Sequence, residues 1–238
     1  MKIFLKPFLL AIGIGLPLFF FSCVDSKKSA ELADTINEGV IGYSIVWPKS
    51  FMDAGFSFIL PKKATMWFTP ENQRYAANGA MDLFSLQLIK SSENDTLFTL
   101  FEAISQKIYT FTIPNQELSW MRMKKDWRTV IIEDSTKLIH DLECTKALLF
   151  EPNAISPTAT VWFTKRIAAK KMYSNTFLEQ IPGVIMEVTG NYNAHYFTIR
   201  ANSIVEKEIP ANWFTTPPEG YQLVRKEEIE EKLRNIFR

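Results

Sequence analysis

The sequence has little from which a catalytic or metal site could be built. It contains only two cysteines, Cys23 and Cys144, and only two histidines, His140 and His195. None of the HExxH, CxxC, GxSxG or P-loop patterns occurs in it. A zinc site from His140, Cys144 and a distant carboxylate, or a Ser-His-Asp triad, would depend entirely on the fold. We therefore expect no enzymatic activity, no metal and no cofactor.

The chain also lacks a strong charge of either sign. Its 27 Lys and Arg residues nearly balance its 26 Asp and Glu residues, for a net charge of +1. This balance gives no basic footprint for nucleic acid, so nucleic acid is not an expected partner. The 47% of hydrophobic and 22% of charged residues exclude a disordered chain. The one basic cluster, at 165–171, is either an ordinary solvated surface or a surface facing anionic lipid headgroups.

The N-terminal 22 residues have the pattern of a bacterial export signal. Lys2 and Lys6 precede an apolar run from Pro7 to Phe21, which is shorter than the roughly 20 residues that a membrane-spanning helix needs. Ser22 and Cys23 follow directly and resemble a lipobox, although Phe20 stands where leucine is preferred. Cleavage before Cys23 would leave this cysteine to carry acyl chains, and the membrane would be a partner through them. Cys144 would then have no disulfide partner in the chain.

Short strands of alternating pattern dominate the rest of the chain. Residues 23–38 are polar and predict a lipidated, flexible tether, and residues 39–238 predict a single antiparallel β domain. The spacing of Ile229, Leu233, Ile236 and Phe237 predicts a C-terminal helix that packs on the sheet. The strands are expected at 39–47, 63–68, 73–78, 83–90, 96–102, 107–113, 127–133, 137–150, 158–167, 183–189 and 194–209.

Several of the expected strands are apolar on both faces. In 83–90 and 96–102 apolar side chains point to both sides, whereas an antiparallel sheet that faces water needs only one apolar face. Such strands indicate a curved sheet whose second face is covered, either by the protein's own helices and loops or by a ligand. The residues that we expect to line a ligand site are Phe84, Leu86, Leu88, Phe98 and Leu100.

A family resemblance appears in 161–167 and 180–188. VWFTKRI, followed by QIPGVIMEV, resembles the GLPGLI signature of envelope proteins of Bacteroidota, with Gln180 and Val184 departing from the pattern. The segments 39–43, 137–147 and 218–221 resemble marks of related uncharacterised families.

These families are similar to the LolA and LolB carriers, and the resemblance implies their fold. That fold is a curved antiparallel half-barrel with covering helical segments, and it implies an internal cavity for acyl chains or another apolar molecule. It implies no catalytic residues. The residues after Cys23 lack the acidic cluster that is associated with surface export in Bacteroidota. We therefore expect an outer-membrane anchor with the domain on the periplasmic side.

Three functions remain open from the sequence. The first is a lipoprotein that binds or carries an apolar ligand, such as a lipid or acyl chain, in its half-barrel. The second is a non-catalytic scaffold of an envelope complex, which predicts a patch of exposed aromatic side chains and an unknown protein partner. The third is a hydrolase, which requires His140 or His195 beside a nucleophile or carboxylate in an open cleft.

Overall fold

The structure is a computed structural model that describes most of the chain after residue 34. The described residues are 35–48, 60–91, 96–112, 127–169, 178–192, 195–215 and 217–236, without the side chains of 91, 191, 192, 195 and 233–236. Asp34–Arg238 form one compact unit. The predicted signal peptide, Cys23, most of the predicted tether and Phe237 lie outside the described residues.

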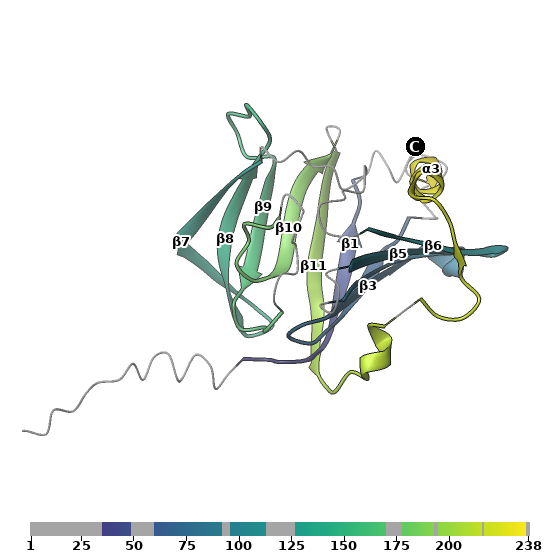
Figure 1. Cartoon of the computed structure of the whole chain (residues 1–238). Coiled ribbons are helices and arrows are strands. Elements are labelled where there is room, and N and C mark those ends of the chain that lie inside the picture. The colour runs from purple at the N-terminus through teal and green to yellow at the C-terminus, as the bar shows by residue number, and fades with distance from the viewer. Residues whose placement is uncertain are drawn as a thin grey trace, which may run out of the picture. The chain divides into compact units, whose positions relative to one another are not determined.

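One open, curved sheet of twelve strands makes up this unit (Figure 1). Its strand order is β12-β6-β5-β4-β3-β2-β1-β11-β10-β9-β8-β7. We call β1–β6 the first wing and β7–β11 the second wing; each is a meander, and the antiparallel pair of β1 and β11 joins them. This arrangement confirms the predicted mainly β fold with a curved antiparallel sheet and a C-terminal helix.

The elements have the following bounds. The first wing consists of β1 (Gly39–Val46), β2 (Lys63–Phe68), β3 (Gln73–Asn78), β4 (Phe84–Ser91), β5 (Thr96–Ala103) and β6 (Gln106–Thr112), with the 3-10 turn η2 (Ala80–Asp82) between β3 and β4. The second wing consists of β7 (Arg128–Ile139), β8 (Leu142–Phe150), β9 (Ala159–Thr164), β10 (Val184–Tyr192) and β11 (His195–Glu206). The C-terminal part contains the 3-10 turn η4 (Ala211–Trp213), β12 (Gln222–Leu223) and the helix α3 (Lys226–Ile236).

The predicted long strand over 137–150 is wrong, because the chain turns back within it. His140 and Asp141 have φ angles of 50° and 61° and form the two-residue turn between β7 and β8. Histidine and aspartate tolerate the left-handed conformation better than most residues, so a two-residue hairpin turn forms here without glycine. Consequently His140 does not share a strand face with Leu142 and Cys144.

The folded chain also begins earlier than the predicted boundary at residue 39. Ile36 forms a parallel bridge with Ile167. Its N–H donates to the carbonyl of Arg166 at 2.8 Å, and its carbonyl accepts from the N–H of Ala168 at 2.9 Å. Because both backbone groups are bonded, the last residues of the predicted tether belong to the folded unit.

Gly183, at the start of the predicted apolar strand, allows a close approach of two strands. A Cβ atom at this position would lie 2.3 Å from the carbonyl oxygen of Thr164. Val184, the next residue, pairs with Thr164 across β9 and β10. The glycine of the Pro182-Gly183 pair is therefore needed for the contact of β10 with β9, which is a physical reason for that dipeptide independent of any resemblance.

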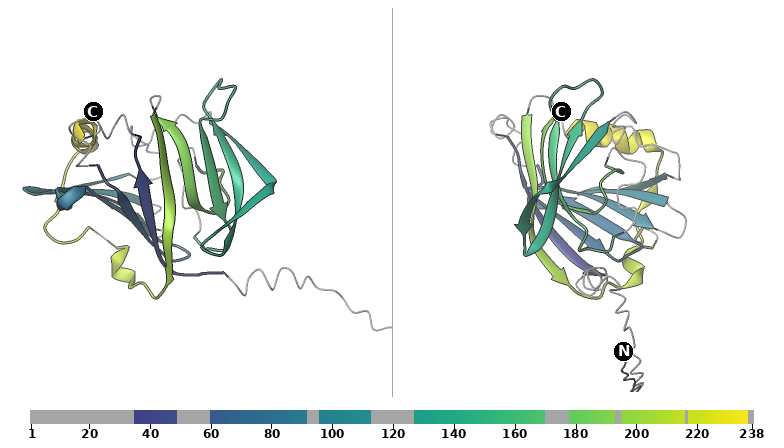
Figure 2. Two further views of the ribbon diagram at one scale, coloured as in Figure 1. Left: turned by 180° about the vertical axis from the view of Figure 1, so that it is seen from behind. Right: turned by 90° about the vertical axis from the view of Figure 1, so that its left-hand side faces the viewer.

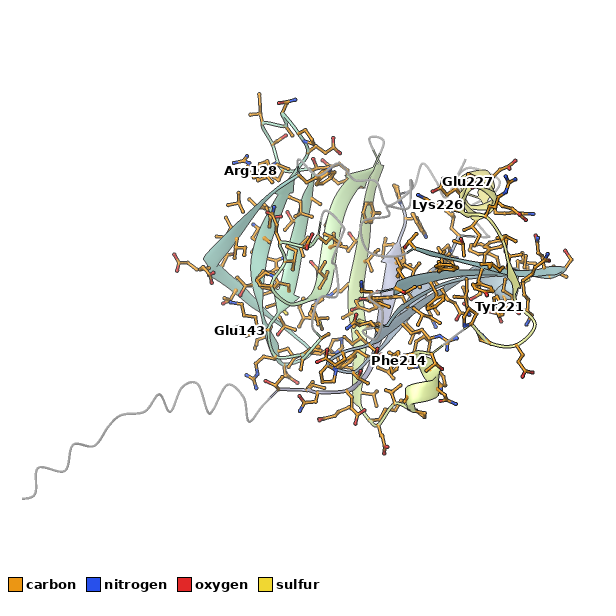
Figure 3. The ribbon with its side chains drawn as sticks, viewed as in Figure 1. Arg128, Glu143, Phe214, Tyr221, Lys226 and Glu227 are labelled. Carbon is orange, nitrogen blue, oxygen red and sulfur yellow. The ribbon has the colours of Figure 1, made fainter. Side chains whose placement is uncertain are left out.

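After β11 the chain wraps around the free edge of the first wing. Residues 207–215 and 217–221, which we call the wrap, cross one face of this wing (Figures 1 and 2). Then β12 pairs in parallel with Ile108 and Tyr109 of β6, and α3 lies on the other face. Phe214 and Tyr221 lie on the first of these faces and Lys226 and Glu227 on the second (Figure 3). We call the two faces the wrap face and the α3 face.

Aromatic and charged contacts hold the wrap on its face. The guanidinium of Arg74 lies 5.9 Å from the ring centre of Trp67 and 5.3 Å from that of Trp213. Arg74 also donates to the side-chain oxygen of Gln87 at 2.6 Å and to the carbonyl of Trp213 at 3.3 Å. Farther along, the hydroxyl of Tyr221 donates to Glu102 at 2.9 Å. The wrap is thus held at two separate places on the first wing.

The contact of Tyr221 with Glu102 predicts a loss of stability at high pH. Burial, and then the hydrogen bond to Glu102, raise the pKa of Tyr221 from 10.0 to about 12. Because the folded state holds this proton more tightly, its stabilising effect is complete below pH 10 and is lost as the pH rises to about 12. Urea unfolding at several pH values should show the stability difference between the wild type and Tyr221→Phe shrinking across that interval. A difference that stays constant would show that folding does not raise the pKa of Tyr221.

Candidate ligand face

The α3 face of the first wing changes from apolar to polar along its strands. Residues that pair directly in an antiparallel sheet share a face, so the register defines rows across β3–β6. The first row is Ala77, Leu86, Phe101 and Ile108; the second is Tyr75, Leu88, Thr99 and Thr110; the third is Gln73, Lys90, Leu97 and Thr112. The surface therefore has an apolar end and a polar end about 13 Å apart, at roughly 3.3 Å per residue.

The helix α3 covers part of the apolar row, at Phe101 and Ile108. Ile229 is fully buried and packs in one cluster with Phe84, Phe101 and Ile108. Leu86 also contacts this cluster but remains partly exposed. The side chains of Leu233 and Ile236 lie outside the described ones, so the predicted docking of the helix is seen at Ile229.

The middle row is only partly covered. Tyr75 and Leu88 are half-buried, whereas Thr99 and Thr110 are buried. The hydroxyl of Thr99 has no hydrogen-bond partner among the described residues. A buried hydroxyl without a partner costs free energy, which a bound polar group or water would recover.

The structure divides the five predicted lining residues between the two faces. Phe84, Leu86 and Leu88 lie on the α3 face, and Phe98 and Leu100 lie on the wrap face, because Phe98 pairs with Ile89 and Leu100 with Gln87. Leu100 is fully buried. The five residues therefore do not form one surface, and only Leu86 and Leu88 of them combine partial exposure with a place on the α3 face.

The chain itself thus supplies a cover for each of the two apolar faces of β4 and β5. Leu100 and Ile89 need cover on the wrap face, which the wrap crosses, while Phe84 and Phe101 need cover on the α3 face. The alternating pattern of β4 and β5 predicted an apolar set on both faces. It did not predict which residues cover each face, because the covering residues lie more than 100 positions later in the chain.

The second wing has one apolar and one charged face. Ala147, Val161 and Val188 pair in one apolar row. On the other face, Lys146 pairs with Trp162, Trp162 with Glu187, and Glu187 with Arg200. The ammonium of Lys137 lies 2.7 Å from Glu187 and 4.4 Å from the ring centre of Trp162. These contacts give the charged side chains partners on their own face of the sheet, and they fix the strand register.

His140 and Cys144 each contact a backbone carbonyl. His140 Nε2 lies 3.2 Å from the carbonyl of Ala201, and the fully buried thiol of Cys144 donates to the carbonyl of Leu142 at 3.4 Å. Burial raises the pKa of Cys144 to about 11, which disfavours the reactive thiolate. No group of three or more described His, Cys, Asp or Glu side chains could hold a metal ion. The side chain of His195 lies outside the described ones.

Two hollows lie on the first wing. One of about 410 Å³ is lined by the start of β2, the end of β3 and η2. The other, of about 600 Å³, lies between the end of β6 and the residues that join β12 to α3. Neither is lined by any of the five predicted residues. No helix in the described part of the chain is long and apolar enough to cross a membrane.

The sequence matches no family model and no curated protein. Several solved structures align with most of the chain. PNGF-II aligns at 12% identity with a TM-score of 0.49, over 84% of this chain and 34% of its own, so the chain spans about a third of that protein. The lipoprotein LppX of Mycobacterium tuberculosis aligns at 10% identity with a TM-score of 0.30, over 78% of this chain and 98% of its own. A LolA superfamily protein of Nitrosomonas europaea aligns at 8% identity with a TM-score of 0.32, over 79% of this chain and 97% of its own.

Proposed function

We propose that the protein is a non-catalytic envelope lipoprotein whose α3 face holds an apolar ligand such as an acyl chain. In this proposal Cys23 carries the acyl chains that anchor it in the outer membrane, with the domain on the periplasmic side. One observation carries the ligand proposal: the apolar surface under α3 continues beyond the helix to Leu86 and Leu88, which are only partly covered.

The polarity of this face suits an amphiphile. An acyl chain would lie along Leu86 and Leu88, next to the buried Phe101 and Ile108. Its polar end would lie toward Thr99, which pairs directly with Leu88 and whose hydroxyl has no partner among the described residues. Apolar contact supplies most of the affinity in such sites, and a few polar groups fix the orientation.

Binding of cis-parinaric acid, a fluorescent fatty acid, tests this proposal. The protein should bind the probe, and Leu88→Asp should weaken binding about tenfold or more, because a carboxylate beside the acyl chain must be desolvated. Leu138→Asp is the matched control, since Leu138 is 68% exposed on β7 and this variant should bind as the wild type does. Circular dichroism of each variant separates loss of binding from loss of fold.

Absence of probe binding by the folded wild type, together with no lipid in an extract of the purified protein, would refute the ligand proposal.

The alternative is an interaction module, and one feature favours it. Phe111 is 44% exposed and Leu223 is 53% exposed, and both line the second hollow. A copurifying protein that is lost in Phe111→Asp, with an empty lipid extract, would support this alternative.

A further inference from the structure

Two exposed apolar side chains stand at the same end of the first wing. Met81, in η2, is 80% exposed, and Ile104, in the turn between β5 and β6, is 84% exposed. Phe84 pairs with Ala103, so the β3–β4 and β5–β6 connections leave the sheet at the same end. Adjacent strands lie about 5 Å apart, which keeps the two connections close together. Both side chains therefore project into solvent from one end of the wing, as two separate turn tips.

The backbone holds Met81 away from the sheet at a conformational cost. Met81 and Asp82 have φ angles of 53° and 54°, in the left-handed region that methionine adopts less readily than glycine, asparagine or aspartate. Hydrogen bonds hold this turn: the N–H of Gly79 donates to the carbonyl of Phe84 at 2.9 Å, and that of Asp82 to the carbonyl of Gly79 at 3.2 Å. A strained residue with an exposed apolar side chain favours a role in binding.

A cationic hollow lies directly beside this turn. Gly79, Ala80 and Asp82 line the hollow of about 410 Å³ on one side, and the exposed Lys62 and Lys63 line it on the other. The two lysines and one aspartate give the lining a net charge of +1. Lysine attracts anionic lipid headgroups.

We propose that this end of the first wing docks on a phospholipid bilayer. Met81 and Ile104 enter the boundary between headgroups and acyl chains, and Lys62 and Lys63 hold a lipid phosphate at the hollow. A bilayer fits these features better than a protein, because the apolar contacts are two separate turn tips rather than a continuous patch. This surface is distinct from the α3 face and does not depend on a ligand there.

Sedimentation with vesicles tests the proposal. The protein for this test lacks residues 1–22 and carries Cys23→Ser, since Asp34–Arg238 form a compact unit of their own. It should bind vesicles of phosphatidylcholine with an equal part of phosphatidylglycerol. The double variant Met81→Asn, Ile104→Asn should bind at least about tenfold more weakly, because two apolar insertions are removed. Asparagine accepts the left-handed conformation of Met81, so this variant should keep the fold.

A second variant tests the hollow. Lys62→Gln with Lys63→Gln should remove most of the preference for the mixed vesicles over pure phosphatidylcholine, roughly fivefold or more. Lys165→Gln with Lys207→Gln is the matched control, because both lysines are exposed elsewhere. Absence of vesicle binding by the wild type, or unchanged binding by the Met81 and Ile104 variant, would overturn the proposal.

Discussion

Replacing Ile229 with aspartate should lower the free energy of unfolding by about 3–5 kcal/mol. Ile229 is fully buried against Phe84, Phe101 and Ile108. Burying an isoleucine side chain contributes about 1.5–3 kcal/mol, and a carboxylate in its place would also have to be desolvated without a partner. At about 2–4 °C for each kcal/mol, the melting temperature should fall by roughly 10 °C.

Thermal unfolding followed by circular dichroism measures this effect. Ile155→Asp is the matched control, because it makes the same substitution at a residue that is 100% exposed. This control should melt within about 1 °C of the wild type, as surface substitutions usually do. If Ile229→Asp melted with the control, α3 would not be docked on the first wing, and the α3 face would be open.

Cys23→Ser should abolish lipid attachment, and a salt wash should then release the protein from the membrane fraction. The expectation rests on the apolar run that ends at Phe21 and on the Ser22-Cys23 pair that follows it. Acyl chains on Cys23 would supply the stable anchor, since two or more chains hold a protein firmly and a serine carries none. Metabolic labelling with palmitate measures the attachment. Fractionation after a salt wash measures the release. In that measurement the variant carries an ordinary cleavable export signal in place of residues 1–22.

Cys144→Ala is the control for this substitution. Cys144 is fully buried, so it is not accessible to acylation in the folded protein, and its variant should keep the label and the membrane location. A label that survived in Cys23→Ser, or that disappeared in Cys144→Ala, would show that Cys23 is not the acylated residue.

The strands were predictable because their signal is local. The alternation in 63–68 and 73–78 gives the bounds of β2 and β3 as the structure has them. The turn at His140 and Asp141 was missed, since neither residue is a glycine or asparagine and the apolar pattern continues on both sides. An alternating pattern can predict that a segment is a strand, but it does not predict a turn that lacks glycine and asparagine.

The candidate site was less predictable for a different reason. The alternation indicated that β4 and β5 have two apolar faces, but not what covers each of them. The covers are the wrap and α3, whose positions depend on the pairing of β12 with β6 and on contacts such as Arg74 with Trp213. These contacts join residues far apart in the chain, and a single sequence carries no direct signal for them.

The order of the strands has a consequence for folding kinetics. Each wing is a meander, and all its strand connections except β1–β2 and β9–β10 have eight residues or fewer, so most of its contacts close short loops at a low entropic cost. The pair of β1 and β11 instead joins Gly39 to Glu206, and it closes a loop of most of the domain. The two meanders can therefore form early and separately, whereas they can pair with each other only after β11 has formed. Until then the free edge of β1 stays open, and this interval is when the chain is most exposed to pairing with another copy of itself.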